Sequence, residues 1–414
     1  MIFSIMKYSY VKFLRILRDV FPATCLLGGF GSANPAMARE QAGDPLFVLS
    51  AEYAADIVTV AQGANDGTRF VDLLTVAGEL DLDKAAGWNG ARMVAQVLAG
   101  TGGRPNDLAG TLQGVNNIEV SKNRVKLYQF YLDQQFAQAP VSLRLGFVDL
   151  NEEFYSNDAA GLLVAPAFGI GSELSATGPN GPSIFPSTAL TARVRIEPSK
   201  TVYAQFAVVN AEAGVLGDRG GVHSLFRNGA LLIGEAGTTR FGKLAAGVWT
   251  YTERQDDIRL IDSGGDPLRK RARGAYALFE MPFARQAGPD GETSDKVTGF
   301  LRAGISDGNT TPFKGGWQAG VLVNGVFPGR PDSQLSIGAN QAFLARKYRL
   351  NGADAGDPQR GAETGLEITY SDKVAPWLTI QPDAQYVWTA SKAPGARDAV
   401  ILGIRFTITQ SREW

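Results

Sequence analysis

The chain has 414 residues, of which 20% are charged and 44% hydrophobic, and its 40 Lys and Arg nearly balance its 41 Asp and Glu. A near-neutral chain lacks the basic excess that draws proteins to nucleic acid, so we expect no nucleic-acid partner. Its apolar residues form no run of about 18, which excludes a membrane-spanning helix. The length allows two or three ordinary domains or one large barrel.

The N-terminal segment has the features of an export signal. Basic residues between positions 7 and 18 precede the short apolar stretch VFPATCLLGGF, and Ala36-Met37-Ala38 fits a cleavage site. We predict a cleavable signal over residues 1–38 and a mature domain over residues 39–414, with a retained amphipathic helix as the alternative. The single cysteine, Cys25, lies in this signal, so the mature chain would have no thiol, as suits an oxidising envelope compartment.

Apolar and polar residues alternate with a period of two in many later segments, which predicts β-strands. In WLTIQPDAQYVW (377–388), for example, Leu378 and Ile380 share one face and Gln381 and Asp383 the other. Strands of about ten residues can cross a bilayer core when tilted, whereas globular strands average about 5–6 residues. Sixteen segments are predicted, at residues 46–62, 69–83, 89–99, 124–136, 140–149, 187–197, 201–210, 229–240, 243–253, 273–284, 296–306, 316–327, 333–345, 361–372, 376–389 and 397–409.

Short and long connections between these segments mostly alternate, as in an up-and-down barrel with plain turns on one rim and long loops on the other. The long loops are expected at residues 100–123, 150–186, 211–226, 254–272 and 346–360. Two connections disagree with the alternation, because 285–295 is long where a turn belongs and 63–68 is short where a loop belongs.

The direction of the apolar faces follows from the number of strands. A ring of sixteen strands encloses more space than side chains can fill, so the interior should be wet and the apolar faces should meet lipid. Aromatic residues near strand ends are typical of the girdles at a bilayer interface, the alternative being the aromatic core of a soluble sandwich; they are Trp249, Tyr251, Trp317, Phe327, Trp377, Tyr386 and Trp388. The predicted fold is all-β, a single 16-stranded antiparallel transmembrane barrel.

No catalytic residue, metal ligand or cofactor is predicted from the sequence. His223, the only histidine, lies in a probable loop, where solvated surface is the usual environment. Glu152 and Glu153 could serve a glycosidase in principle, but adjacent side chains of an extended chain point apart. Polar side chains on the inward faces argue instead for a water-filled pore.

Several stretches resemble the OprB-type carbohydrate-selective porins of the Gram-negative outer membrane. The similar segments are NNIEVSKNRVKLYQFYLDQQF (116–136), VSLRLGFVDLNEEF (141–154), PAFGI (166–170), GVFPGRPDSQLSIG (325–338) and LEITYSDKVAPWLTIQPDAQYVW (366–388). Departures from the family pattern are Gln129 in place of a glutamate, TASKAPG after the Pro-Trp-Leu strand, and a closing aromatic displaced to Trp414.

The resemblance implies a barrel channel for passive diffusion of sugars, with long extracellular loops, of which 150–186 folds inward. The expected partners are sugars, outer-membrane lipid and lipopolysaccharide, the barrel-insertion machinery and two further copies in a homotrimer. The alternatives are a general-diffusion or anion-preferring porin and an exported β-protein or outer-membrane enzyme. The candidates for channel lining and sugar contact are Arg92, Lys126, Gln129, Asp133, Arg144, Arg193, Arg195, Arg302 and Arg405.

Overall fold

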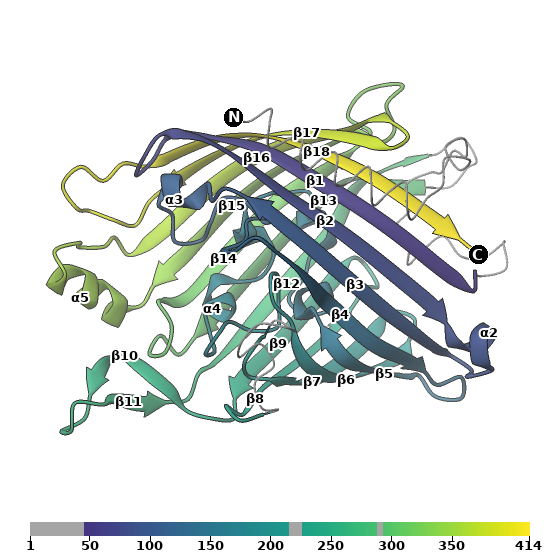
Figure 1. Cartoon of the computed structure of the whole chain (residues 1–414), viewed down its shortest axis with the longest axis horizontal. Coiled ribbons are helices and arrows are strands. Elements are labelled where there is room, and N and C mark those ends of the chain that lie inside the picture. The colour runs from purple at the N-terminus through teal and green to yellow at the C-terminus, as the bar shows by residue number, and fades with distance from the viewer. Residues whose placement is uncertain (1–44, 215–225, 288–292) are drawn as a thin grey trace.

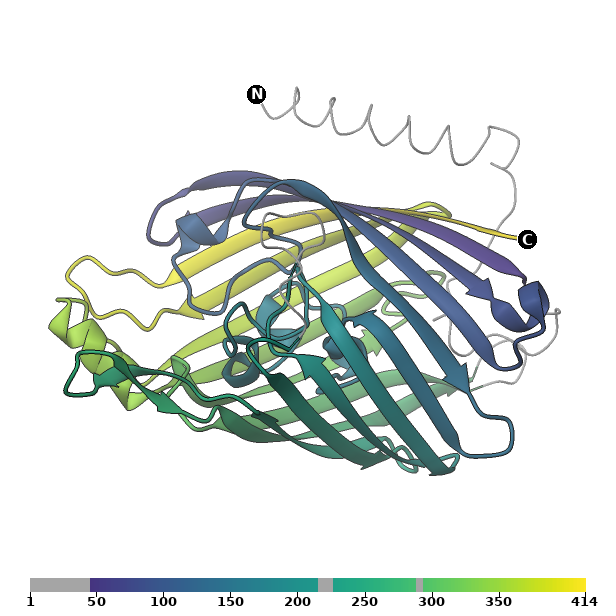
Figure 2. The same ribbon diagram turned by 60° about the horizontal axis from the view of Figure 1, so that its bottom comes forward.

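The structure, a computed structural model, describes residues 45–214, 226–287 and 293–414. Within these residues sixteen strands close into one antiparallel barrel, in which β1 (Phe47–Gln62) pairs with both β2 (Gly67–Asp81) and β18 (Ala399–Glu413). Every other barrel strand pairs with its neighbours along the chain, as Figures 1 and 2 show. The predicted fold class is confirmed, whereas the predicted signal over 1–38 and His223 lie outside the described residues.

The strand bounds agree with the predicted segments to within a few residues. The other barrel strands are β3 (Ala91–Gly102), β4 (Arg124–Gln135), β5 (Val141–Val148), β6 (Ala189–Ser199), β7 (Val202–Asn210), β8 (Ala230–Thr238), β9 (Lys243–Tyr251), β12 (Arg273–Ala287), β13 (Thr293–Ser306), β14 (Phe313–Asn324), β15 (Gln334–Leu344), β16 (Ala362–Ala375) and β17 (Leu378–Trp388).

Short helices and one hairpin lie in the connections between the barrel strands. They are α2 (Leu82–Ala86), α3 (Asn106–Ala109), α4 (Ser172–Ser175), α5 (Arg346–Asp354), the 3-10 helices η2 (Leu150–Glu152), η3 (Asp158–Ala160) and η4 (Pro166–Phe168), and the hairpin β10 (Gln255–Ile261) with β11 (Pro267–Lys270). In the described part of the chain, no helix is both long enough and apolar enough to pass through a bilayer.

The alternation in β17 has the predicted orientation. Gln381, Asp383 and Gln385 are buried on the lumen side, and Trp388 points outward with 38% of its surface exposed. Pro382 pairs with β18, but the β16–β17 ladder omits the pair it would form with Tyr370, because proline has no N–H to donate. The barrel thus accommodates Pro382 where the pairing between β16 and β17 is interrupted.

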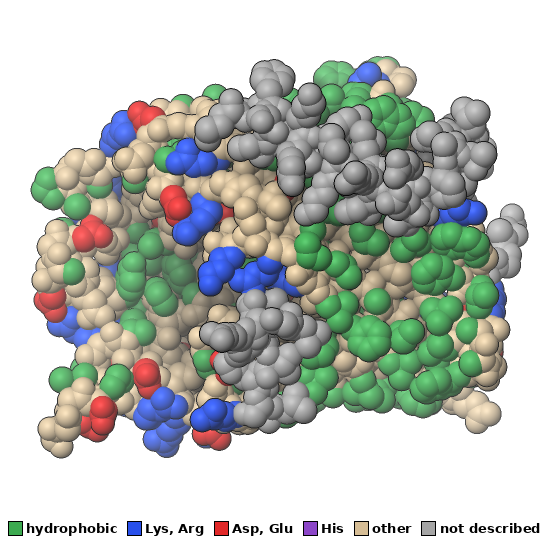
Figure 3. Space-filling model, in the orientation of Figure 1, with side chains coloured by type: hydrophobic (Ala, Val, Ile, Leu, Met, Phe, Trp, Pro, Cys, Tyr) green, Lys and Arg blue, Asp and Glu red, His purple; other side chains and the backbone are tan. Residues whose placement is uncertain are grey.

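Outward-facing apolar side chains form a broad band on the barrel. Figure 3 shows hydrophobic side chains over the right-hand part of the face it presents, while Lys, Arg, Asp and Glu gather toward the end that carries the long loops. Large exposed apolar residues are what a lipid-facing wall requires, and they include Val125, Phe130, Leu145, Val194, Phe206, Val248, Phe283, Leu301 and Ile305.

Both connections that broke the alternation are explained by their neighbours. The strands β12 and β13 continue through the pair Arg285–Asp295, so most of the 285–295 segment is strand and not loop. The short 63–66 connection is covered by the next loop, since Asn65 N–H donates to the Leu108 carbonyl at 2.8 Å. At the closing strand, β18 runs on to Glu413, which places Trp414 directly at the strand end with its ring 5.4 Å from that of Phe47.

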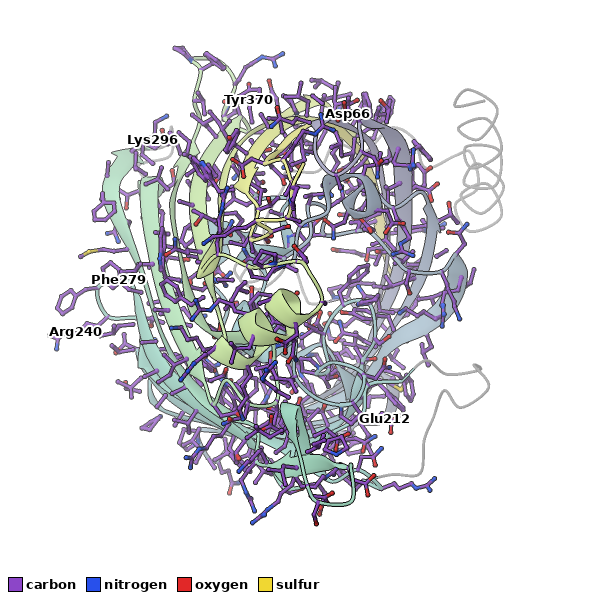
Figure 4. The ribbon with its side chains drawn as sticks, turned by 90° about the vertical axis from the view of Figure 1, so that its left-hand side faces the viewer. Asp66, Glu212, Arg240, Phe279, Lys296 and Tyr370 are labelled. Atoms are coloured by element: carbon purple, nitrogen blue, oxygen red, sulfur yellow. The ribbon has the colours of Figure 1, made fainter. Side chains whose placement is uncertain are left out.

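Two connections fold into the lumen, which we name the first inward loop (residues 103–123) and the second inward loop (residues 149–188). The predicted inward folding of 150–186 is present, and the first inward loop was not predicted. The two loops contact each other, because Ser172 Oγ donates to Gln113 Oε1 at 2.9 Å. Seen along the barrel from the long-loop end, they occupy part of the ring of strands behind α5 (Figure 4).

The second inward loop packs on an apolar patch of the inner wall over β7, β8, β9 and β12. Trp249 and Tyr251 belong to this patch and are 2% and 1% exposed, so the prediction that they form part of a lipid-interface girdle is wrong. The ring of Tyr155, from the loop, stacks on Tyr276, from the wall, with centroids 4.0 Å apart. The prediction of a wet interior is therefore wrong for this side of the barrel, where the loop and the wall form a packed apolar core.

Candidate selectivity site in the lumen

A charged cluster on the inner wall of β3, β4, β5 and β6 centres on Asp133. Its Oδ2 accepts hydrogen bonds from Arg92 at 3.0 Å and Arg144 at 2.9 Å, and Arg193 lies 3.6 Å from its Oδ1. The register explains the grouping, since Arg92 pairs with Asp133, Asp133 with Arg144, and Arg144 with Arg193 across successive strands. Four predicted residues therefore meet at one level of the barrel.

The second inward loop contributes a carboxylate to this cluster. Arg193 holds Glu153 in a two-pronged ion pair, with its Nε and one terminal nitrogen at 2.9 and 2.8 Å from the two oxygens. Arg144 lies 3.6 Å from Glu153 and stacks on the Tyr131 ring at 4.3 Å. Two-pronged Arg–carboxylate pairs are geometrically rigid, so the loop is held at a defined place against the wall.

The arginines of the cluster differ in accessibility. The Arg92 side chain is 40% exposed and also binds Glu79 at 3.3 Å, while the Arg144 and Arg193 side chains are only 8% and 3% exposed. Arg92 is therefore the member that faces the channel, and the other two hold the carboxylates in place. Arg195, one step further along β6, lies over the Tyr203 ring at 4.4 Å and pairs with Glu197 at 2.9 Å.

Gln129 connects the wall to the base of the second inward loop. Its amide nitrogen donates to Gln96 at 3.0 Å and to Glu152 at 2.6 Å, and its oxygen accepts from Asp149 N–H at 2.9 Å. Burial, followed by repulsion from Asp149, raises the pKa of Glu152 to about 7. A glutamate at position 129 would place another carboxylate beside Glu152, so the neutral amide suits this loop.

A β-bulge in β4 brings Lys126 and Gln129 to the same face. Because these residues are three apart, regular alternation would put them on opposite faces. The register shifts between Gln96 and Val97 of β3, which pair with Gln129 and Leu127 and leave Tyr128 as the extra residue. Lys126 is buried on the lumen side with its ammonium 5.8 Å from the centre of the Tyr128 ring.

A second ion pair lies on β1 and β18 beside the first inward loop. Arg405 binds both oxygens of Asp56 at 2.8 Å and donates to Asn117 Oδ1 at 2.7 Å. Asn116, the preceding loop residue, donates to Asp56 at 2.5 Å. Arg405 thus holds the first inward loop and keeps limited access to the lumen, with 13% of its side chain exposed.

Arg302 has a different environment from the one predicted. It is 1% exposed and donates to the carbonyls of Tyr155, Ala167 and Gly169 and to Gln318, at 2.9 to 3.2 Å. The second inward loop covers it completely, so in this structure it faces a loop and not the channel. Its contacts are those of an anchor, because a guanidinium can satisfy several carbonyls that would otherwise be buried without donors.

Glutamates on the inner wall also hold the loops, a role that sequence reasoning missed. Glu363 accepts from the backbone N–H of Leu112 and Gln113 at 2.9 to 3.0 Å, and Glu367 accepts from those of Val164 and Ala165. The available signal was their spacing of four residues in β16, which puts both glutamates on one face of the strand. The loop that each glutamate contacts depends on the closure of the barrel, so it could not be predicted from the sequence around the glutamate.

The described residues contain no group of three or more His, Cys, Asp or Glu placed to hold a metal ion. The carboxylates Glu152 and Glu153 bind different partners, Gln129 and Arg193. The charges in the lumen are therefore arranged as wall-to-loop contacts along a channel.

A closed sixteen-stranded barrel with an apolar outer band, inward loops and charged inner wall defines the porin class. Residues 67–409 match the family described as carbohydrate-selective porin, OprB family, and the chain belongs to this family. It is thus an outer-membrane β-barrel porin of the Gram-negative type, for carbohydrates, as the sequence predicted.

Individual relatives agree with this assignment. Porin B of Pseudomonas aeruginosa is 23% identical over 397 residues, which cover 86% of this chain and 85% of that protein. The high-pH structure of Pseudomonas putida OprB has a TM-score of 0.76 at 18% identity, with 88% of this chain and 94% of that chain covered. The channel DcaP of Acinetobacter baumannii has a TM-score of 0.57 at 11% identity, with 93% and 100% covered. At these identities the two solved structures support the fold alone.

Proposed function

We propose that the chain is a passive channel without catalytic activity, in which the Asp133 cluster selects sugars at the narrowed part of the lumen. The observation that carries this proposal is the meeting of Arg92, Arg144 and Arg193 with Asp133 and Glu153 on both wall and loop. Because each charge is already partnered, the cluster offers donors and acceptors to sugar hydroxyls without holding an ion tightly. Release then remains fast enough for diffusion.

Sugar block of the ion current tests this function. The purified protein should give discrete conductance steps in planar bilayers, and added monosaccharide should partly block them. An absence of conductance steps would rule out a channel. Conductance insensitive to sugars would instead fit a general-diffusion or anion-preferring porin.

The Asp133→Asn variant tests the site itself. It keeps the shape of the side chain but removes the carboxylate on which Arg92 and Arg144 converge. We expect weaker sugar block and a shift of the reversal potential toward anions. Asp295→Asn is a matched control, since Asp295 pairs with Arg285 at the exposed end of β12 and β13, away from the cluster. If the two variants showed the same sugar block and the same reversal potential, Asp133 would not be part of the selectivity site.

The remaining expected partners belong to the same proposal. We infer that the protein functions as a homotrimer in lipid and lipopolysaccharide, and that the insertion machinery recognises the end of β18 with Trp414. The packing of Trp414 against Phe47 supports a defined terminal strand. Cross-linking in outer membranes, which should give a species of three chains, and assembly of a Trp414→Ala variant test the two inferences. A monomeric product and normal assembly, respectively, would contradict them.

A further inference from the structure

We propose that the outer rim of the barrel over β12, β13 and β14 binds the phosphorylated headgroup of lipopolysaccharide. Three exposed cations, Arg271, Arg273 and Lys314, make the contact, and we name them the rim cations. The proposal rests on the lipopolysaccharide partner inferred above and specifies where, and by which groups, that partner is bound.

The alternation at the start of β12 directs two of the rim cations away from the lumen. Ala272 and Tyr276 are buried in the apolar core between the second inward loop and the wall. Arg271 and Arg273 alternate with these inward residues, so they lie on the outer face, and both are exposed. They lie at the end of the barrel that carries the long loops, from which the β10–β11 hairpin projects (Figure 1).

The ladder from β12 through β13 to β14 brings Lys314 to the level of Arg273. The pairs nearest this end are Gly274–Ser306 and Ile305–Gly315. Arg273 and Lys314 each lie one residue beyond these pairs, on strands that are two spacings apart, or about 10 Å at about 4.8 Å per spacing. Lys314 is the extra residue of a β-bulge, and it is exposed beside the outward-facing Ile305.

The rim cations have no ion pair among the residues that the structure describes. Three other arginines at the long-loop end are paired, as Arg104–Asp107 at 2.7 Å, Arg397–Asp66 at 2.9 Å and Arg360–Asp398 at 3.4 Å. An arginine without a carboxylate partner can bind a phosphate through two parallel hydrogen bonds. The rim over β12 to β14 is therefore distinguished by cations that remain available to an anion.

Positive charge remains in excess when the nearby acids are counted. Two carboxylates without a Lys or Arg partner lie close in the chain, Asp307 after β13 and Glu253 after β9. Asp307 is engaged in its own turn, where it accepts from the Asn309 N–H at 2.9 Å and the Thr310 hydroxyl at 3.1 Å. Lys270, which is also exposed, adds a fourth cation, so four cations are opposed by two carboxylates.

An apolar surface lies next to the rim cations on the same outer face, toward the short turns. Val248, Ile305 and Leu301 are 64%, 65% and 50% exposed there. Trp317 borders this surface, and its indole N–H donates to Gln341 at 3.2 Å, as suits a residue of the interfacial girdle. Cations just beyond such a girdle lie at the level of lipid headgroups. A phosphorylated lipid of the outer leaflet fits both features, with its acyl chains on the apolar surface and its phosphates at the rim.

The test measures binding of lipid A, the phosphorylated anchor of lipopolysaccharide, to the folded barrel in detergent by native mass spectrometry. Dephosphorylated lipid A and phosphatidylglycerol are the comparison lipids. We expect lipid A to bind more tightly than either. Inorganic phosphate at the same concentration should not displace it, because phosphate lacks the acyl chains that bury apolar surface.

The triple variant Arg271→Gln, Arg273→Gln and Lys314→Gln should weaken binding of lipid A by about 100-fold, since one cation near an anionic headgroup contributes about a factor of five. The matched control carries Lys200→Gln, Arg240→Gln and Arg285→Gln, which remove three exposed cations at the short-turn end. The control should bind lipid A as the unchanged protein does. A gel-mobility test shows that both variants are folded.

Binding that the folded triple variant retains, or that the control loses to the same extent, would overturn the site and leave the lipopolysaccharide partner intact. Equal binding of dephosphorylated lipid A would show apolar packing alone, and equal binding of phosphatidylglycerol would show a general site for anionic lipids; either result would overturn the proposal. No binding of lipid A to the unchanged protein would overturn the partner as well. Because the rim cations lie outside the lumen, sugar block tests the channel function separately.

Discussion

Replacing Arg302 with methionine should loosen the second inward loop without unfolding the barrel. Arg302 donates to the carbonyls of Tyr155, Ala167 and Gly169 in the loop and to Gln318 on the wall. Methionine fills much of the same space but donates no hydrogen bond, so three loop carbonyls lose a buried donor. The ladders from β13 to β12 and β14 are backbone contacts and remain.

The magnitude follows from the number of bonds. A hydrogen bond from a charged donor contributes about 1.5–3 kcal/mol, so three bonds to the loop amount to about 4–9 kcal/mol. The backbone entropy gained when loop residues are released, about 1–2 kcal/mol per residue, acts in the same direction. Glu235 and Glu367 still hold other points of the loop, at Tyr155, Val164 and Ala165, so we expect loosening and not full release.

The assay is single-channel recording in planar bilayers together with a gel-mobility test of folding. Arg302→Met should give a larger and noisier conductance step than the unchanged protein while remaining folded. Arg285→Met is the matched control, because Arg285 lies on the neighbouring β12 with its side chain 63% exposed and pairs with Asp295 outside the lumen. A folded Arg302→Met channel with unchanged conductance and noise would refute the anchoring argument.

Two further predictions concern charge in the lumen. The pKa of Glu152 is raised to about 7, so its carboxyl is neutral in the folded state at acidic pH. Its contribution to folding stability is therefore complete below the ordinary pKa of 4.5 and is lost as pH rises through about 7. Cation selectivity should accordingly rise through the same range, and Glu152→Gln should abolish that step in a reversal-potential titration; persistence of the step would contradict this assignment. Arg193→Ala removes the cation that holds Glu153, so the reversal potential should shift toward cations, whereas Arg285→Ala should leave it unchanged; the same reversal potential in both variants would contradict the role of Arg193.

Some of the candidate site could be read from the sequence because it depends on local alternation. Arg92, Asp133, Arg144 and Arg193 lie on inward faces, and they meet because their strands β3 to β6 are consecutive and pair as neighbours in the barrel. Arg302 obeyed the same alternation, yet it is covered by a loop that begins about 150 residues earlier. The alternation of apolar and polar residues predicts which face of the strand a side chain occupies, but it does not predict what packs against that face.

The sequence by itself determined the strand number, the antiparallel order and the lipid-facing set, because a period of two is a local property repeated sixteen times. Tertiary structure decided the rest. The bulge at Tyr128, the burial of Trp249 and Tyr251, and the glutamates that hold the loops all depend on contacts between distant segments. The physical reason is closure, since only a closed ring brings the inward loops against far strands and makes part of the lumen a packed interior and part a channel.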